Sequence, residues 1–95
     1  MLINLEGISV EEIDADFIRT GKEVKSILDR GIAATAAGDS GAVNIWKDDD
    51  GWIRCEAMRW MNPVDKKIFD NIDEVEKWAD KWLPDIGVLP YEDED

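Results

Sequence analysis

The sequence KKIFDNIDEVEKWADKWL, residues 66–83, joins a short β-prone segment to an amphipathic helix. Ile68 and Phe69 are followed by the turn formers Asp70 and Asn71, which predicts a strand that ends at this point. Asn71 is a favoured N-cap, and Glu74 three residues later completes a capping-box pattern. The apolar residues that follow have the spacing of one helix face: Ile72, Val75, Trp78, Ala79, Trp82 and Leu83. We expect a helix over residues 72–83, ended by Pro84, that packs this face on a core.

The opposite face of the same predicted helix is acidic. It carries Asp73, Glu74, Glu76 and Asp80 against two lysines, Lys77 and Lys81. Three of the acids follow i, i+3, i+7 spacing, which places neighbouring carboxylates about 5–6 Å apart. That spacing is comparable to the spacing of phosphates along one DNA strand, so the row is able to compete for basic side chains that bind nucleic acid. The same row is equally typical of a solvated helix face whose lysines form local ion pairs.

Two further strands are predicted upstream of this unit. Residues 42–47 (AVNIWK) and 52–60 (WIRCEAMRW) are rich in β-prone residues, and Asp48-Asp49-Asp50-Gly51 joins them. An Asp-Gly turn between such segments is a strong hairpin signal. With a four-residue loop, Trp46 pairs with Ile53, and a slip of one residue exchanges the two faces. In the predicted register one face carries Trp46, Ile53, Cys55 and Ala57.

The N-terminal third contains two helix-start signals. Ser9 with Glu12 and Thr20 with Glu23 form S-x-x-E and T-x-x-E capping boxes. They predict helices over about residues 10–19 and 21–37, before a glycine-containing linker at residues 38–41. Residues 1–7 form either a terminal strand or an ordered arm. Residues 61–65 are expected to form a turn that leads into the third strand.

These elements predict an α+β fold with two N-terminal helices, a three-stranded antiparallel meander and a C-terminal amphipathic helix. A chain of 95 residues is long enough for one domain with a modest core. We expect that domain to cover residues 1–88. Residues 89–95 end in four acids and are expected to be a disordered acidic C-terminal tail.

The charge balance limits the classes of function. Twenty-three acidic and eleven basic residues give a net charge of −12, and the chain has no histidine. Direct binding to nucleic acid or to an anionic membrane is disfavoured, because both need a basic surface. The balance favours plain solubility, a basic protein partner, or mimicry of a nucleic-acid backbone. Because histidine is the commonest general base and no catalytic spacing is present, we expect no enzyme activity.

We expect no cofactor and no metal site. The cluster Asp48–Asp50 lacks the alternating ligands and the twelfth-position glutamate of an EF-hand loop. The single cysteine, Cys55, suits a buried strand position and a reducing cytosol. The sequence shows neither a signal segment nor a run of about 18 apolar residues, which predicts a cytoplasmic protein.

Two segments, VNIWKDDDGWIRCEAM (residues 43–58) and IFDNIDEVEKWADKWL (residues 68–83), carry a family resemblance. In element order and composition they resemble small phage-encoded anti-CRISPR proteins that inhibit type I surveillance complexes. The resemblance covers about half of the chain, and the two N-terminal helices have no counterpart. Some members of that group are strongly acidic and occupy the DNA-binding groove of the complex, whereas others bind its protein backbone. The resemblance implies an inhibitor that acts in the host cytoplasm.

We therefore expect a non-enzymatic inhibitor that binds a basic protein or ribonucleoprotein surface, with a Cascade-type complex as the suspected partner. It would block DNA recognition through an acidic, DNA-mimicking surface, with Trp52 and Trp60 as aromatic anchors unless the core takes them. The candidate contact residues are Asp48, Asp49, Asp50, Trp52, Trp60, Asp73, Glu74, Glu76 and Asp80. The alternatives are an immunity or antitoxin-like protein that neutralises a basic toxin such as a nuclease, and a phage accessory protein with a structural role. The oligomeric state stays open.

Overall fold

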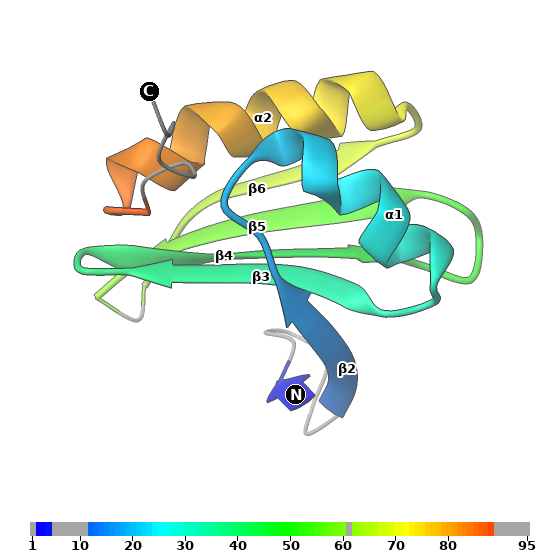
Figure 1. The fold of residues 1–95 in the computed structure, drawn as a ribbon, viewed down its shortest axis with the longest axis horizontal. Helices are drawn as coiled ribbons and strands as arrows, with labels where there is room; N and C mark the ends of the chain where they lie inside the picture. The colour runs from blue at the N-terminus through cyan, green and yellow to red at the C-terminus, as the bar shows by residue number, and fades with distance from the viewer. Residues whose placement is uncertain (1, 5–11, 61, 89–95) are drawn as a thin grey trace, which may run out of the picture.

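The computed structural model describes residues 2–4, 12–60 and 62–88 of the chain. The elements in chain order are β1 (Leu2–Asn4), β2 (Glu12–Phe17), the 3-10 turn η1 (Gly21–Glu23), α1 (Val24–Asp29), β3 (Ala33–Gly38), β4 (Gly41–Lys47), β5 (Ile53–Arg59), β6 (Asn62–Phe69) and α2 (Ile72–Asp85). Figure 1 shows η1, α1 and α2 above a sheet that these strands form.

The strands follow one another across the sheet in the order β1-β2-β3-β4-β5-β6. Among the strands that the structure describes, only the β2–β3 pair is parallel, and α1 lies in the connection between its two strands. β1 pairs with the start of β2, where Leu2 faces Asp14, whereas β3 pairs with the end of β2, where Ala15 faces Ala33. The body of the protein is therefore a five-stranded mixed sheet, β2–β6, with β1 attached to the outer half of β2.

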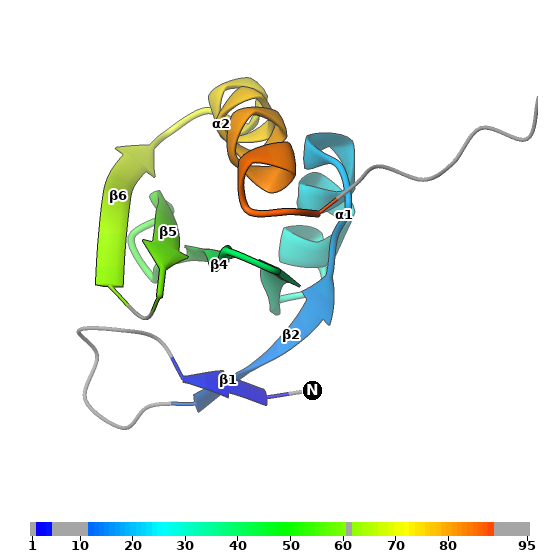
Figure 2. The same cartoon turned by 90° about the vertical axis from the view of Figure 1, so that its left-hand side faces the viewer.

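The core lies between one face of this sheet and the helices. It contains Val43 and Ile45 of β4, Ile53, Cys55 and Ala57 of β5, Val24, Ile27 and Leu28 from the first helical segment, and Val75, Trp78, Ala79 and Leu83 of α2. Figure 2 shows both helices on this side of the sheet and β1 on the other. Small side chains on β3, including Ala34 and Ala36, leave room for the helices to pack closely.

The prediction of two N-terminal helices and a three-stranded meander is wrong. Residues 12–17 form β2, because their apolar side chains alternate with acids at every second position, which is a strand period. The predicted helix over 21–37 ends at Asp29 with Arg30 as its C-cap, and Gly31, with φ +79°, then turns the chain out of the helix. Residues 33–38 then enter the sheet as β3. Ser9, the first predicted cap, lies outside the described residues.

The hairpin prediction is confirmed in its strands and wrong in its register. Asp48 N–H donates to the carbonyl of Trp52 at 2.8 Å, so the loop between them has three residues rather than four. As a result Ile45 faces Cys55 and Trp46 faces Arg54. The core therefore takes Ile45, and Trp46 lies on the sheet face away from the helices. Residues 62–65, expected to form a turn, are the first half of β6.

The features of α2 are largely confirmed. Asn71 Oδ1 accepts the Asp73 N–H at 2.7 Å as the N-cap, and Val75, Trp78, Ala79 and Leu83 are buried. Pro84 does not end the helix, because it lies within the last turn, which runs to Asp85. The second predicted capping box is also confirmed, since Glu23 Oε1 accepts the Thr20 N–H at 3.0 Å. The tail at 89–95 lies outside the described residues. No described helix has the length and apolar character needed to cross a membrane.

Candidate protein-interaction surface

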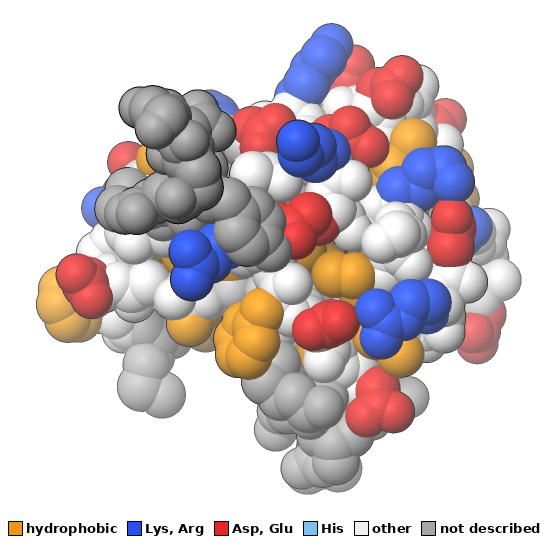
Figure 3. Space-filling model, viewed as in Figure 1, with side chains coloured by type: hydrophobic (Ala, Val, Ile, Leu, Met, Phe, Trp, Pro, Cys, Tyr) orange, Lys and Arg blue, Asp and Glu red, His pale blue; other side chains and the backbone are white. Residues whose placement is uncertain are grey.

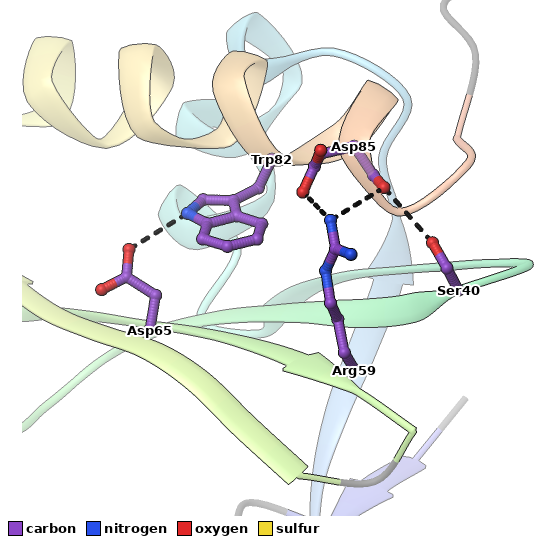
Figure 4. Close-up of polar contacts among 5 residues, drawn as sticks. All are labelled: Ser40, Arg59, Asp65, Trp82 and Asp85. Carbon is purple, nitrogen blue, oxygen red and sulfur yellow. Dashed lines mark hydrogen bonds and ion pairs between the residues drawn. The ribbon is translucent and has the colours of Figure 1, made fainter.

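A single carboxylate fixes the middle of α2 over β6. Asp65 Oδ2 accepts hydrogen bonds from the indole Nε1 of Trp78 at 2.9 Å and of Trp82 at 3.0 Å (Figure 4 shows the second). Burial acts to raise the pKa of Asp65, but the two indole hydrogen bonds, with Lys67 and Lys81 nearby, outweigh it and hold that pKa below its usual value. The two tryptophans of α2 therefore serve the fold.

The end of α2 is tied to the sheet by Arg59. Its guanidinium forms an ion pair with the Asp85 carboxylate and lies 6.0 Å from the ring centre of Trp82 (Figure 4). Ser40 Oγ donates to the backbone carbonyl of Asp85 at 3.2 Å, which ties the β3–β4 turn to the same point. These contacts fix the end of α2 against one end of the sheet, where the β3–β4 turn lies beside the end of β5.

Two of the predicted contact residues on α2 lie against η1, Asp80 through its side chain and Glu76 through its backbone. Asp80 Oδ1 accepts the Gly21 N–H at 2.7 Å. Gly21 also lies so close to α2 that a Cβ added to it would meet the Glu76 carbonyl oxygen at 2.2 Å. Glu76 is half-buried at this junction. The acidic row on the helix is thus partly taken up by packing between α2 and η1.

Asp73 and Glu74 remain exposed on the first turn of α2. Figure 3 shows Lys and Arg side chains interspersed with Asp and Glu over the side of the molecule that the helices form. The surface over the helices is therefore of mixed charge, and it does not present an uninterrupted row of carboxylates.

The acidic loop between β4 and β5 is ordered by its own side chains. Asp48 forms an ion pair with Arg54, and Asp50 Oδ1 accepts the Trp52 N–H at 3.0 Å. Asp49 and Asp50 are exposed. Of the three acids predicted here, Asp48 thus has an internal basic partner, and the other two point their charge to solvent at the tip of the hairpin.

The five tryptophans divide into two groups. Trp46 and Trp78 are each 7% exposed and Trp82 is partly buried against the core, whereas Trp52 is 44% and Trp60 76% exposed. Trp60 has φ 51°, the left-handed region in which glycine or asparagine is favoured and a bulky residue is strained. Strained, exposed aromatic residues concentrate at functional sites, so Trp60 is the strongest candidate among the predicted contacts.

Two exposed apolar residues of β6 were not expected from the sequence. Val64 is 47% and Ile68 53% exposed, and both belong to β6, the last strand of the sheet. The pair Asn62-Pro63 is typical of a turn, so the sequence did not indicate that β6 begins at Asn62. The exposed apolar surface therefore extends from Trp60 along β6.

The two exposed tryptophans lie at separate ends of the molecule. Trp60 follows β5, near the end of α2, while Trp52 precedes β5, near the start of α2. The seven residues of β5 separate the two tryptophans, which places them eight residue steps, or about 26 Å, apart. Asp49, Asp50, Asp73 and Glu74 belong to the Trp52 end. A partner that touches both tryptophans must cover the full length of β5.

A depression of about 230 Å³ lies at the Trp52 end. It is lined by residues of α1, the β4–β5 loop and the β6–α2 junction, among them Lys25, Asp29, Lys47 and Asp70. Lys25 and Asp29 pair with each other at 2.8 Å, which raises the pKa of Lys25. This small depression of balanced charge offers no concentrated field for a charged substrate.

Among the residues that the structure describes, no group of three or more acids or cysteines is placed to hold a metal ion. Burial raises the pKa of the Cys55 thiol to about 12, and the residue is 2% exposed. A thiol that stays protonated and enclosed is inert as a nucleophile. Cys55 therefore contributes to packing.

The net charge is unevenly spread along the chain. Residues 14–88 contain sixteen acids and all eleven basic residues, whereas residues 1–13 and 89–95 contain seven acids and no basic residue. More than half of the net charge of −12 thus belongs to the two chain ends. Comparison of the chain with protein-family models, curated proteins and solved structures gave no match.

Proposed function

We propose that this protein acts by binding, and that its partner is a basic, nucleic-acid-handling protein or ribonucleoprotein. The observation that carries the proposal is the exposure of Trp52 and Trp60, one of them held in a strained backbone conformation. A folded chain of 95 residues gains stability by burying tryptophan, so two exposed ones indicate a surface selected for contact.

The charge distribution supports a basic partner. Exposed Asp49 and Asp50 lie near Trp52, with Asp73 and Glu74 at the same end of the molecule. The N- and C-terminal segments, residues 1–13 and 89–95, contain acids and no basic residue. Complementary charge accelerates encounter and sets the orientation, while buried aromatic anchors supply most of the affinity. Such a protein inhibits its partner by occupying or covering the surface that nucleic acid needs.

In its most specific form the proposal is an anti-CRISPR activity against a type I surveillance complex. The test mixes the full chain with such a complex and measures binding of target DNA by the complex. We expect DNA binding to fall as the protein is added, with the inhibition weakened at high salt because the acids act through charge. Full DNA binding at saturating protein overturns this form of the proposal for that complex.

Substitution of the exposed tryptophans tests the surface itself. Trp52→Ala and Trp60→Gly should each raise the dissociation constant from the complex by about 30-fold or more, since anchor residues contribute 2 kcal/mol or more. Glycine is chosen at position 60 because it suits φ 51° and leaves the turn intact. Phe17→Ala is the matched control, because Phe17 is 60% exposed but lies on β2. If all three substitutions change the dissociation constant equally, the assignment of the contact surface to Trp52 and Trp60 is overturned.

A further inference from the structure

Among the residues that the structure describes, no strand pairs with the outer edge of β6. This strand is last in the sheet order, and Figure 2 shows its outer side turned away from the helices and from the other strands. Val64 and Ile68 on it are 47% and 53% exposed. An open edge with exposed apolar side chains is a template for pairing with another strand.

The sequence of this edge is complementary to itself. When two copies of the segment VDKKI run antiparallel about Lys66, Asp65 of one copy faces Lys67 of the other. In the same register Val64 of one copy faces Ile68 of the other. A twofold axis at Lys66 therefore forms two opposite-charge pairs and two apolar pairs, each of which stabilises an antiparallel sheet.

The side-chain directions within β6 fit this pairing. Asp65 and Lys67 face Ala57 and Cys55 of β5, so both lie on the face of the sheet that the helices cover. Asp65 Oδ1 and Lys67 Nζ are 4.0 Å apart within one chain, and the Lys67 side chain is 55% exposed. The lysine is therefore free to reach the carboxylate of a second copy.

The one unfavourable contact in this register is between the two copies of Lys66. Its cross-strand neighbour on β5 is Glu56, which is 2% exposed. Across the joined sheet, neighbouring strands then carry Glu56 and Lys66 of one copy followed by Lys66 and Glu56 of the other. Each lysine therefore has an acid of its own copy beside it. This arrangement offsets the repulsion between the two ammonium groups.

The length of the paired segment is limited by Pro63 and by a bulge at Val64, which has no partner on β5 because Asp65 pairs with Ala57 and Pro63 with Met58. Proline has no N–H to donate, and a bulge turns the strand away from a continued ladder. We propose that β6 is a homodimer interface, in which two copies of this chain join edge to edge over residues 64–68. This dimer does not depend on the inhibitor function proposed above.

Sedimentation equilibrium of the full chain over a range of concentrations tests the dimer directly. Lys67→Glu places like charges opposite each other twice, and we expect its dissociation constant to rise about tenfold. Lys47→Glu makes the same change in net charge at an exposed residue of β4, away from the β6 edge, and should change the constant less than about twofold. A wild-type chain that stays monomeric at every concentration overturns the proposal.

Disulfide cross-linking tests the register. Lys66→Cys places two cysteines at the axis with Cα atoms about 4.5–5.5 Å apart, within the range a disulfide spans. With oxidised glutathione as oxidant, this variant should form a covalent dimer. Ile68→Cys is the matched control, because its two copies lie about 13 Å apart in this register. The native Cys55 is buried and does not compete. A dimer that cross-links through position 68 and not 66 overturns the proposed interface.

Discussion

At the scale of single residues, Asp65 connects a strand to a helix through its side chain. One carboxylate oxygen receives two indole N–H groups and so joins β6 to α2. Hydrogen bonds to a charged group contribute about 1.5–3 kcal/mol, because the ionised oxygen is a stronger acceptor than a neutral one. No local pattern indicates this role, because residues 61–65 are expected to form a turn.

Asp65→Asn should reduce the free energy of unfolding by about 1–2 kcal/mol at pH 7, because the amide oxygen is a weaker acceptor. The folded pKa of Asp65 lies below its ordinary value of 3.8. The stabilisation is therefore fully present above about pH 5, and it is lost as pH falls below 3.8 toward the folded pKa. Urea unfolding of both chains between pH 3 and pH 7, followed by tryptophan fluorescence, measures this difference.

The control for this series is Asp70→Asn, which removes an exposed carboxylate five residues further along the chain. It should change stability by less than about 0.5 kcal/mol at any pH in the range, as surface substitutions usually do. A constant difference between wild type and Asp65→Asn down to pH 3 would show that the carboxylate's charge is not what stabilises the indole contacts.

At the scale of elements, the C-terminal half was predictable because local signals and packing agree there. The Asn71 cap, the apolar stripe of α2 and the Asp-Gly hairpin each point to the structure that forms. Trp52 and Trp60 are the anchor candidates because the other three tryptophans are expected in the core; both are exposed, and their anchor role stays a prediction. What local reasoning missed was the hairpin register, which a single hydrogen bond from Asp48 to Trp52 decides.

The N-terminal half was not predictable to the same degree, because tertiary pairing overrides helix propensity there. The segment AATAAG has strong helix formers, yet it lies between β2 and β4 as β3. Alanines suit that place because a thin strand lets both helices pack closely on the sheet. Gly31 was the available signal, since a glycine after a helical stretch more often ends a helix than continues it.

The junction of η1 and α2 predicts a contrast between two glycines. Gly21→Ala should reduce the free energy of unfolding by about 3 kcal/mol or more, because its Cβ would lie 2.2 Å from the Glu76 carbonyl oxygen and α2 must shift. Gly31→Ala should cost only about 1–2 kcal/mol, the strain of φ +79°, since no atom lies within 4 Å of its Cβ. Thermal unfolding followed by circular dichroism measures both. The reverse order would mean that α2 is loosely held at this junction.

At the scale of the whole molecule, the charge distribution determines how salt acts on stability. The net charge of −12 repels itself more strongly in the compact state than in the unfolded chain. The exposed ion pairs, such as Lys25–Asp29 and Arg30–Asp16, act in the opposite sense but contribute little each. The Debye length, beyond which charges no longer interact strongly, is about 30 Å at 0.01 M salt and about 3 Å at 1 M. The described body measures 28 Å across its middle axis, so low salt leaves the repulsion nearly unscreened.

Raising NaCl from about 0.01 M to about 0.5 M at pH 7 should therefore increase the free energy of unfolding, by about 1 kcal/mol. The variant Glu92→Gln/Asp93→Asn/Glu94→Gln/Asp95→Asn removes four charges that have no basic residue beside them in sequence. Its stability should depend less on salt than that of the wild type, because less net charge remains to be screened. Urea unfolding at each salt concentration measures both slopes. If salt lowers the stability of the wild type instead, attraction within the ion pairs outweighs repulsion from the net charge. The excess of acids then does not destabilise the fold, and it needs no explanation through binding.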